Sequence, residues 1–180
     1  MTRKTNPARF RIEMIAWVAL IVFIGYRIWP QVAAVVGVAS ANAPAPPMHL
    51  ATLAGTSVSD KSLRGNVVLV NFWATWCGPC RYEMPGFQAV YDRHRAEGFT
   101  VLGISTDGDP ALVTTFLGAR HITYPVAMAT GDVVRAFGGV SVLPRSFLID
   151  RKGRIRNKVT GIFAPFALEQ AVRQLLADST

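Results

Sequence analysis

The sequence predicts an α/β domain that follows an N-terminal membrane helix, and three observations support this. Residues 67–72 and 101–105 are short β-branched and aromatic runs, typical of strands buried on both faces. Other segments have helical spacing or helix-start residues. The N-terminus is basic and then apolar, in the order of a membrane anchor. A length of 180 residues fits one domain with such a segment in front.

We expect four parts along the chain: a basic cytoplasmic tail at 1–11, a transmembrane anchor at 12–29, a linker rich in proline and alanine at 30–47, and the folded domain at 48–180. The uncharged run at 14–26 is shorter than the roughly 20 residues that cross a bilayer. The span must therefore include Glu13 or Arg27, or continue toward Val38. The basic flank predicts a single-pass membrane protein with its N-terminus in the cytoplasm and its domain outside it.

A signal sequence, cleaved or uncleaved, is the alternative for this segment. Residues 41–43 have the small-x-small form of a cleavage site. Arg27 and Pro30 separate this site from the main apolar run, so a retained anchor is favoured.

The first half of the domain begins with an edge strand at 48–53 and a turn or short helix at 60–65. The buried strand at 67–72 leads into a helix at 80–95, and the second buried strand, 101–105, follows. Asp109 and Pro110 form a helix start, with aspartate as cap and proline in the first position. The helix at 110–119 is expected to point four apolar side chains inward: Leu112, Val113, Phe116 and Leu117.

The second half begins with a short strand at 124–128 and a short helix at 132–137. Strands at 146–150 and 155–160 flank a basic turn, which predicts a β-hairpin. The last segment, 165–177, has Leu168, Val172, Leu175 and Leu176 at helical spacing, and we expect it to pack on the sheet.

The only two cysteines, Cys77 and Cys80, lie between the strand at 67–72 and the helix that follows it. If that helix begins near Cys77, free backbone N–H groups and the helix dipole favour its thiolate, which makes Cys77 the candidate nucleophile. Cys80 lies one turn away on the same helix face, as a resolving thiol. Pro79 lacks an N–H, which suits a first helical turn.

Three other readings of the cysteine pair compete with redox chemistry. A structural zinc site needs about four ligands, and His49, His94 and His121 show no paired spacing. A structural disulfide would close a loop too short to restrain the unfolded chain. Two buried, inert thiols remain an alternative. The two-residue gap beside an aromatic residue and a proline favours redox chemistry, without a metal or other cofactor.

Residues 70–81, with Glu83, Met84 and Pro85 after them, resemble the membrane-anchored TlpA/ResA/DsbE-like thiol-disulfide oxidoreductases of the thioredoxin superfamily. The run Trp76-Cys77-Gly78-Pro79-Cys80 matches the signature of that superfamily, and 144–150 matches a later motif. The resemblance covers about 45–177. It implies a thioredoxin-like fold with a central mixed sheet flanked by helices, and an inserted helix and strand near 124–137.

The resemblance also implies a substrate site around the cysteines. Pro144 is expected to be a cis-proline against the disulfide, which leaves the backbone of Leu143 free to pair with an extended substrate. An ordinary trans proline is the alternative. Trp76, Gly78, Pro79 and Arg145 complete the expected substrate-binding set. Trp73 and Trp76 are either core residues or a partly exposed surface that receives partners.

Two positions depart from the family pattern. Soluble thioredoxins have a buried aspartate where this chain has Asn71, and many TlpA-like proteins carry an acid at the position of Glu83. A partly buried Glu83 would have a raised pKa and could manage the proton of the resolving thiol; a solvated first-turn glutamate is the alternative. Arg145 stands where the family has a small polar or acidic residue. It would stabilise a thiolate, select an acidic partner, or simply be exposed.

The predicted function is a membrane-tethered thiol-disulfide oxidoreductase that reduces disulfides in extracytoplasmic proteins. The resemblance suggests apocytochrome c or metal-site cysteines as targets and a membrane thiol transporter as electron donor. One alternative is a thiol peroxidase of the peroxiredoxin kind, although Ala74 and Val70 stand where its signature has threonine and proline. Another is a copper(I) carrier helped by Met48 or Met84.

Net charge is +8, and half of it precedes the domain. The rest is concentrated around the predicted hairpin, at Arg151, Lys152, Arg154, Arg156 and Lys158. A solvated edge is the favoured interpretation, and a surface for an acidic protein or anionic lipid is the alternative. Nucleic acid is an improbable partner for an exported domain.

Overall fold

The computed structural model describes residues 13–14, 17–20, 22–23, 39–40 and 42–178. The chain divides into two units, Met1–Val36 and Gly37–Thr180. The described residues of the first unit are helical and exposed. No helix among the described residues is long and apolar enough to cross a bilayer. The basic tail at 1–11 and most of the predicted anchor at 12–29 lie outside the described residues.

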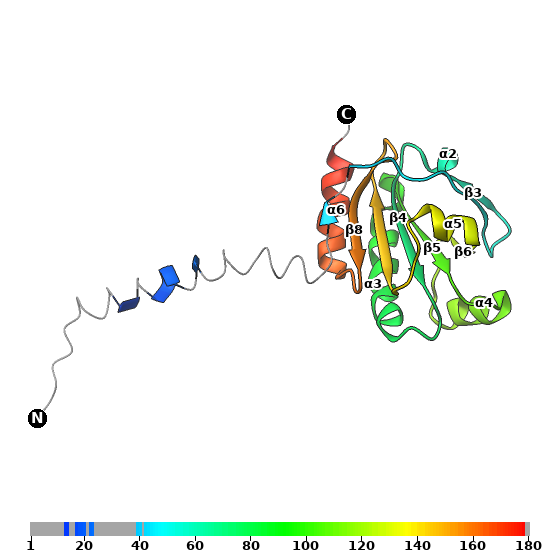
Figure 1. The fold of residues 1–180 in the computed structure, drawn as a ribbon, viewed down its shortest axis with the longest axis horizontal. Coiled ribbons are helices and arrows are strands. Elements are labelled where there is room, and N and C mark those ends of the chain that lie inside the picture. Colours follow the sequence, from blue (N-terminus) through cyan, green and yellow to red (C-terminus); the bar gives the residue numbers. More distant parts are fainter. Residues whose placement is uncertain (1–12, 15–16, 21, 24–38, 41, 179–180) are drawn as a thin grey trace, which may run out of the picture. The chain divides into compact units, whose positions relative to one another are not determined.

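The second unit is built on a mixed sheet (Figure 1). In the described residues this sheet has the order β1-β8-β7-β4-β5-β6. The strands are β1 (Ala39–Ser40), β4 (Val67–Trp73), β5 (Phe99–Ser105), β6 (Val126–Met128), β7 (Arg145–Ile149) and β8 (Ile155–Thr160). Strand β5 pairs in parallel with β4 and β6, whereas β7 pairs antiparallel with β4 and β8. The predicted mixed sheet and the predicted hairpin are therefore confirmed.

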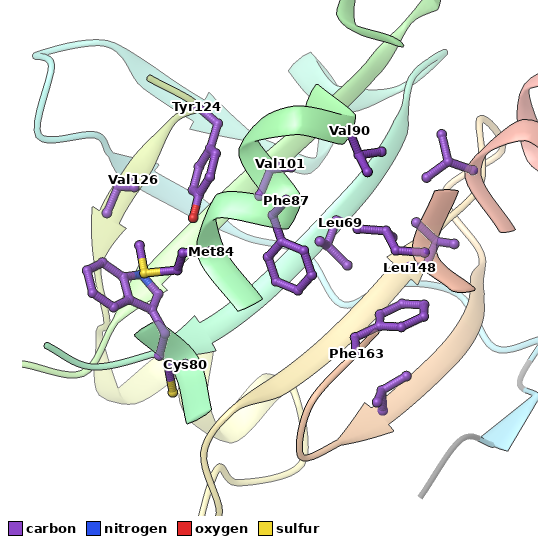
Figure 2. Packing of buried hydrophobic residues seen from close by; sticks show 14 of the residues in the cluster. Leu69, Cys80, Met84, Phe87, Val90, Val101, Tyr124, Val126, Leu148 and Phe163 are labelled. Atoms are coloured by element: carbon purple, nitrogen blue, oxygen red, sulfur yellow. The ribbon is translucent and has the colours of Figure 1, made fainter. Parts of the chain in front are cut away.

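Strand β4 lies between β7 and β5 in the sheet, and every one of its residues is buried. Its side chains alternate between two cores. Val67, Leu69 and Trp73 belong to one core, and the intervening Val68, Val70 and Phe72 belong to the other. Figure 2 shows part of the first core, in which residues of one helix meet strand residues: Cys80, Met84, Phe87 and Val90 against Leu69 and Leu148.

The helices are α2 (Asp60–Leu63), α3 (Gly78–His94), α4 (Pro110–Ala119), α5 (Gly131–Ala136) and α6 (Pro165–Ala177), with a short 3₁₀ turn, η1, at Arg95–Glu97. Helices α3 and α6 cover the first core, together with Val113 of α4. Val133 of α5 and Leu63 of α2 pack into the second. The sheet is thus covered by helices on both faces.

The predicted bounds of 110–119, 155–160 and 165–177 agree with α4, β8 and α6. Within α4 the inward set was wrong at one position, because Leu112 is 51% exposed while Val113 is buried. Residues 48–53 also differ from expectation. They contain β2 (His49–Ala51), which pairs with β3 (Ser57–Ser59) in a separate small sheet. Only a single bridge, from Thr52 to Ala127, joins this hairpin to β6.

The last part of the predicted linker belongs to the domain. Strand β1 pairs antiparallel with β8, and Pro44 forms a bridge with Arg154. Ala45 N donates to Gly153 O at 2.8 Å, and Ile155 N donates to Ala43 O at 2.8 Å. Small residues and prolines in this stretch suggested an extended chain, and that extended conformation is what the open edge of β8 pairs with. The remaining linker residues, 30–38, lie outside the described residues.

Most of the basic hairpin is bound within the domain. Arg151 donates to the carbonyls of Gly65 and Glu97, at 2.8 and 2.9 Å. Arg154 donates to Asn42, and Arg156 pairs with Asp150 at 3.2 Å. These guanidinium groups satisfy backbone carbonyls and a carboxylate at the end of the sheet. A purely solvated edge is therefore too simple a description of this turn.

Candidate active site

Cys77 and Cys80 lie where β4 leads into α3, and they form a disulfide with Cα atoms 5.3 Å apart. Cys77 is the N-cap residue of α3, and Cys80 N donates to Cys77 Sγ at 3.3 Å. Cys80 is fully buried, whereas Cys77 retains 5% exposure. The expected start of the helix at Cys77 is confirmed. In the reduced protein, this position sets the Cys77 sulfur against free N–H groups and the positive end of the helix dipole.

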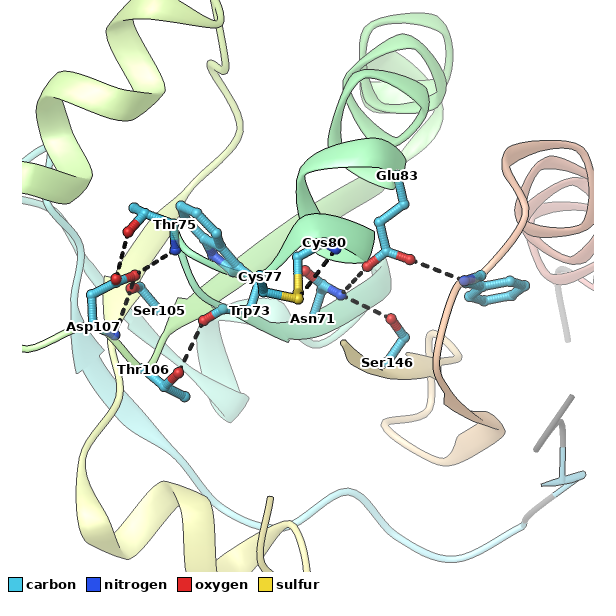
Figure 3. Close-up of a disulfide and its surroundings, with 11 residues drawn as sticks. Asn71, Trp73, Thr75, Cys77, Cys80, Glu83, Ser105, Thr106, Asp107 and Ser146 are labelled. Carbon is cyan, nitrogen blue, oxygen red and sulfur yellow. Dashed lines mark hydrogen bonds between the residues drawn. A yellow bond between two sulfur atoms is a disulfide. The ribbon is translucent and has the colours of Figure 1, made fainter. Parts of the chain in front are cut away.

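Glu83 lies one turn beyond Cys80 on α3 and is fully buried. Figure 3 shows its carboxyl group between Asn71 and the backbone of another segment. Asn71 Nδ2 donates to Oε1 at 3.0 Å and also to Ser146 Oγ at 3.0 Å. Phe163 N donates to Oε2 at 3.0 Å. The solvated first-turn glutamate that the sequence left open is therefore not what the structure shows.

Burial raises the pKa of Glu83 to about 7, although the hydrogen bonds from Phe163 and Asn71 act in the opposite direction. Desolvation dominates because the two donors only partly replace the water that a charged carboxylate loses. A carboxyl group with this pKa exchanges protons readily near neutral pH. Along α3, this carboxyl-bearing residue lies one helical turn after the buried Cys80.

A second polar group holds the loop in front of Cys77. Asp107 accepts hydrogen bonds from Thr75 N at 2.9 Å, Thr75 Oγ1 at 2.6 Å and Ser105 Oγ at 2.7 Å (Figure 3). Thr106 N also donates to Trp73 O at 2.9 Å. The residues that follow β5 thus fasten the residues that follow β4.

The Leu143–Pro144 peptide bond is cis, as the resemblance implied. Leu143 lines a groove of about 570 Å³ that contains Cys77. The groove is lined by Trp76, Cys77, Gly78, Pro79, Thr106, Val140, Ser141, Val142 and Leu143. Four of the five predicted substrate-binding residues are therefore brought together here. Trp76 is 71% exposed while Trp73 is buried, so the two tryptophans have different surroundings.

Arg145 is the predicted binding residue that does not line the groove. Its Nη1 donates to Gly139 O at 2.9 Å, and its guanidinium lies 5.4 Å from the ring centroid of Phe147. This side chain holds the segment just before Val140, which forms one wall of the groove. All the lining residues are uncharged.

Similarity to known proteins agrees with this geometry. Residues 40–175 match the model of the Redoxin family. The chain belongs to the Redoxin family. The thiol-disulfide oxidoreductase ResA of Bacillus anthracis is 33% identical over 117 residues, which cover 65% of this chain and 68% of that protein. ResA of Geobacillus thermodenitrificans is 29% identical over 168 residues, which cover 93% of this chain and 96% of the relative.

Solved structures place the Redoxin domain in the thioredoxin fold. A thiol:disulfide interchange protein of the thioredoxin family from Chlorobium tepidum has a TM-score of 0.71 and 34% identity, and the match covers 77% of this chain and 99% of that one. StoA of Bacillus subtilis has a TM-score of 0.62 and 25% identity over 71% of this chain and 97% of its own. The TlpA/ResA/DsbE-like resemblance is confirmed. This Redoxin protein is a thiol-disulfide oxidoreductase, which implies disulfide-containing substrates.

Sequence reasoning missed the role of Asp107 and of the Phe163 N–H. One signal was available for Asp107, because it comes soon after a buried strand, and the carboxyl ends of neighbouring parallel strands meet at the same edge of a sheet. No signal was available for Phe163, since its contact with Glu83 joins residues 80 positions apart through a backbone atom.

Proposed function

We propose that this protein is a membrane-tethered reductase of disulfides in extracytoplasmic proteins, with Cys77 as nucleophile and Cys80 as resolving thiol. The observation that carries the proposal is the asymmetry of the two sulfurs. Cys77 caps a helix and opens into a groove, whereas Cys80 is fully buried beside the carboxyl-bearing turn of the same helix. Such asymmetry suits a reaction in which the accessible sulfur attacks the partner and the buried sulfur then resolves the mixed disulfide.

The reaction balances over two exchange steps. The Cys77 thiolate attacks one sulfur of the partner's disulfide, a Cys77–partner bond forms, and the second partner sulfur leaves as a thiolate that takes a proton. Cys80 then loses its proton and attacks Cys77 Sγ. The Cys77–Cys80 disulfide forms, the mixed disulfide breaks, and the first partner sulfur leaves. Two electrons have passed from the enzyme to the partner.

Glu83 is proposed to accept the proton of Cys80 in the second step. With a pKa raised to about 7 it is partly ionised at neutral pH, and the groups that donate hydrogen bonds to it, Asn71 Nδ2 and Phe163 N, are uncharged. Asn71, which cannot ionise, occupies the place of the thioredoxin aspartate and donates to Glu83 instead. The proton-handling group has in this way moved from β4 to α3.

The partner is proposed to enter the groove as an extended segment that pairs with the backbone of Leu143 beside the cis-proline. Trp76, Gly78 and Pro79 would contact it from the Cys77 side. Arg145 is proposed to act on the opposite wall through Gly139, since its guanidinium is occupied there. Because the lining is uncharged, recognition in the groove would depend on shape and apolar contact.

The anchor at 12–29 is proposed to tether the domain on the periplasmic or outer side of a bacterial inner membrane. The basic residues at 1–11 and the apolar run after them support this topology. A membrane thiol transporter is proposed to return electrons to the Cys77–Cys80 disulfide, and apocytochrome c or metal-site cysteines are proposed as targets.

A trapping experiment tests this function. Cys80→Ser removes the resolving thiol, so we expect the full-length protein expressed in bacterial cells to accumulate mixed disulfides on Cys77, recovered in the membrane fraction after an alkaline wash and identified by mass spectrometry. The matched control, Cys77→Ser, leaves only the buried Cys80 and should trap nothing. Equal yields from the two variants, or an empty trap, would contradict the assigned roles, and adducts found only in the soluble fraction would contradict the tether.

A further inference from the structure

Gly86 of α3 leaves a gap that Pro165 fills. A Cβ atom placed on Gly86 would lie 2.2 Å from Pro165 Cγ and 2.7 Å from Pro165 Cβ, which no real side chain tolerates. Glycine inside a helix costs about 1 kcal/mol relative to alanine. Its presence in the second turn after the cysteines is therefore explained by the close approach of α6 to α3.

The residues just before Pro165 hold two other points of the site. Phe163, two residues earlier and buried, donates its N–H to Glu83 Oε2 at 3.0 Å. Gly161 donates its N–H to the carbonyl of Pro144 at 2.8 Å, and its φ of 89° is one that glycine adopts without strain. The strap, as we call residues 161–165, therefore runs from the cis-proline past the buried carboxyl to the gap at Gly86.

We propose that Gly86 is a positioning residue for Glu83: the gap at Gly86 seats Pro165, and this seat holds the Phe163 N–H against the Glu83 carboxyl. The catalytic use of Glu83 rests on the function proposed above, but the positioning itself does not. Gly86 contacts neither sulfur in the structure and would act only through the strap.

The direction of the effect follows from what surrounds Glu83. Its carboxyl group accepts hydrogen bonds from Asn71 Nδ2 of β4 and from the Phe163 N–H of the strap. The Tyr124 hydroxyl is the titratable group that faces it from before β6, and burial raises the pKa of that hydroxyl. The arginines of the elements that pack around it have other partners: Arg145 of β7 donates to Gly139, and Arg93 of α3 and Arg173 of α6 pair with Glu169. Removing the Phe163 N–H leaves the carboxylate with fewer donors, so the pKa of Glu83 should rise above about 7.

The test is Gly86→Ala in the full-length oxidised protein, where the disulfide removes both thiols from the titration. The Glu83 carboxyl carbon is followed by NMR against pH after ¹³C labelling, and Glu83→Gln assigns its signal. Because a hydrogen bond to a charged group is lost, we expect the midpoint to move up by about one pH unit. Gly118→Ala is the matched control, since it also replaces a helical glycine but meets nothing within 4 Å. It should leave the midpoint in place.

Two further variants keep the proposal testable if Gly86→Ala does not fold. Pro165→Ala empties the seat without adding bulk to α3 and should shift the midpoint in the same direction by less. Combining Gly86→Ala with Pro165→Gly adds a methyl group on α3 and removes the proline ring that it would clash with. This double variant should bring the titration midpoint of Glu83 back toward the wild-type value. An unchanged midpoint in the folded variants, or no recovery in the exchanged pair, would overturn the proposal.

The same variants separate this inference from the proposed role of Glu83. Disulfide exchange with a test protein is followed against pH after reduction. If the titration midpoint of Glu83 and the midpoint of the pH–rate profile move up together, both the positioning role of Gly86 and the catalytic role of Glu83 are supported. If the carboxyl midpoint moves while the profile stays, Gly86 positions Glu83 and the catalytic role of Glu83 is wrong.

Discussion

Glu83 illustrates how far a single side chain depends on its surroundings. The same residue in a solvated first helical turn would be an ordinary carboxylate, whereas here it is fully buried and hydrogen-bonded to Asn71 and to a backbone N–H. Burial without a cation raises its pKa to about 7. The folded protein therefore holds a proton on this group at pH values where the unfolded chain does not.

A pH-dependent cost in stability follows from this shift. The folded-state pKa of about 7 lies above the ordinary value of 4.5, so between these values the folded state binds more protons than the unfolded state. Stability from this group is present below pH 4.5 and is lost as pH rises through 7. Glu83→Gln removes the titration and retains an acceptor for Phe163 N. The wild type should lose about 3 kcal/mol relative to this variant over that range.

Chemical denaturation of the two oxidised proteins at several pH values measures this difference. The contributions of all other titrating groups cancel because both proteins contain them. A difference in unfolding free energy that stays constant from pH 4.5 to 8 would show that Glu83 titrates normally in the fold.

The junction of β4 and α3 is the element on which the chemistry depends, and a neighbouring strand end holds it. Asp107 follows β5, and its carboxylate accepts hydrogen bonds from the backbone N–H and the hydroxyl of Thr75, two residues before Cys77. Parallel pairing of β4 with β5 brings the two strand ends together at the same edge. Asp107 is thus a positioning residue for the loop that presents Cys77.

Asp107→Ala should slow disulfide exchange several-fold, because a loop displaced by even about 1 Å misaligns the attacking sulfur. Asp109→Ala is the matched control. That aspartate also accepts from a backbone N–H, at Ala111, but it caps α4 rather than the cysteine loop. Both changes should lower stability, by about 1–3 kcal/mol.

Stopped-flow exchange between the reduced protein and a small disulfide measures the rate, and thermal unfolding measures the stability. Equal rates for the two aspartate variants would mean that Asp107 supports only the fold.

Across the domain, the exposed edge of the sheet is protected by the chain that enters it. Residues 39–40 pair with β8, residues 43–45 lie against β8 and the turn before it, and Arg154 donates to Asn42. An uncovered β8 would present free N–H and carbonyl groups to other chains. The entry segment is therefore part of the domain and blocks edge-to-edge association.

Two soluble versions of the domain test this conclusion. A chain that begins at residue 38 keeps the pairing, whereas one that begins at residue 48 loses it. The shorter chain should be less stable by about 2 kcal/mol, because the two backbone hydrogen bonds of Ala43 and Ala45, worth about 1 kcal/mol each, are lost with the entry segment. Urea unfolding gives the stability, and size-exclusion chromatography shows whether the shorter chain self-associates. Identical stability of the two versions would show that the entry segment adds nothing to the domain and belongs to the linker.

Much of the fold and the centre of the site follow from local sequence. Unbroken apolar runs predict the buried strands, Asp109-Pro110 predicts a helix start, and the spacing of the two cysteines predicts the reactive pair. Each of these features is encoded within a few neighbouring residues. The positions of Cys77 and Cys80 were predictable for this reason, whereas the cis-proline at Pro144 was implied by the family resemblance. The inward set of α4 was not fully predictable, since Leu112 and Val113 are equally apolar and only packing distinguishes them.

Contacts between distant segments were decided by the tertiary structure alone. Whether Glu83 is buried depends on Phe163 and Asn71, and whether residues 39–40 form a strand depends on the free edge of β8. Arg145 likewise became a support for Gly139 only when the two segments met. Sequence specifies which groups are present and their local conformation. Desolvation and edge pairing arise only when the chain brings separate segments together, and these set the chemistry of Glu83 and the limits of the domain.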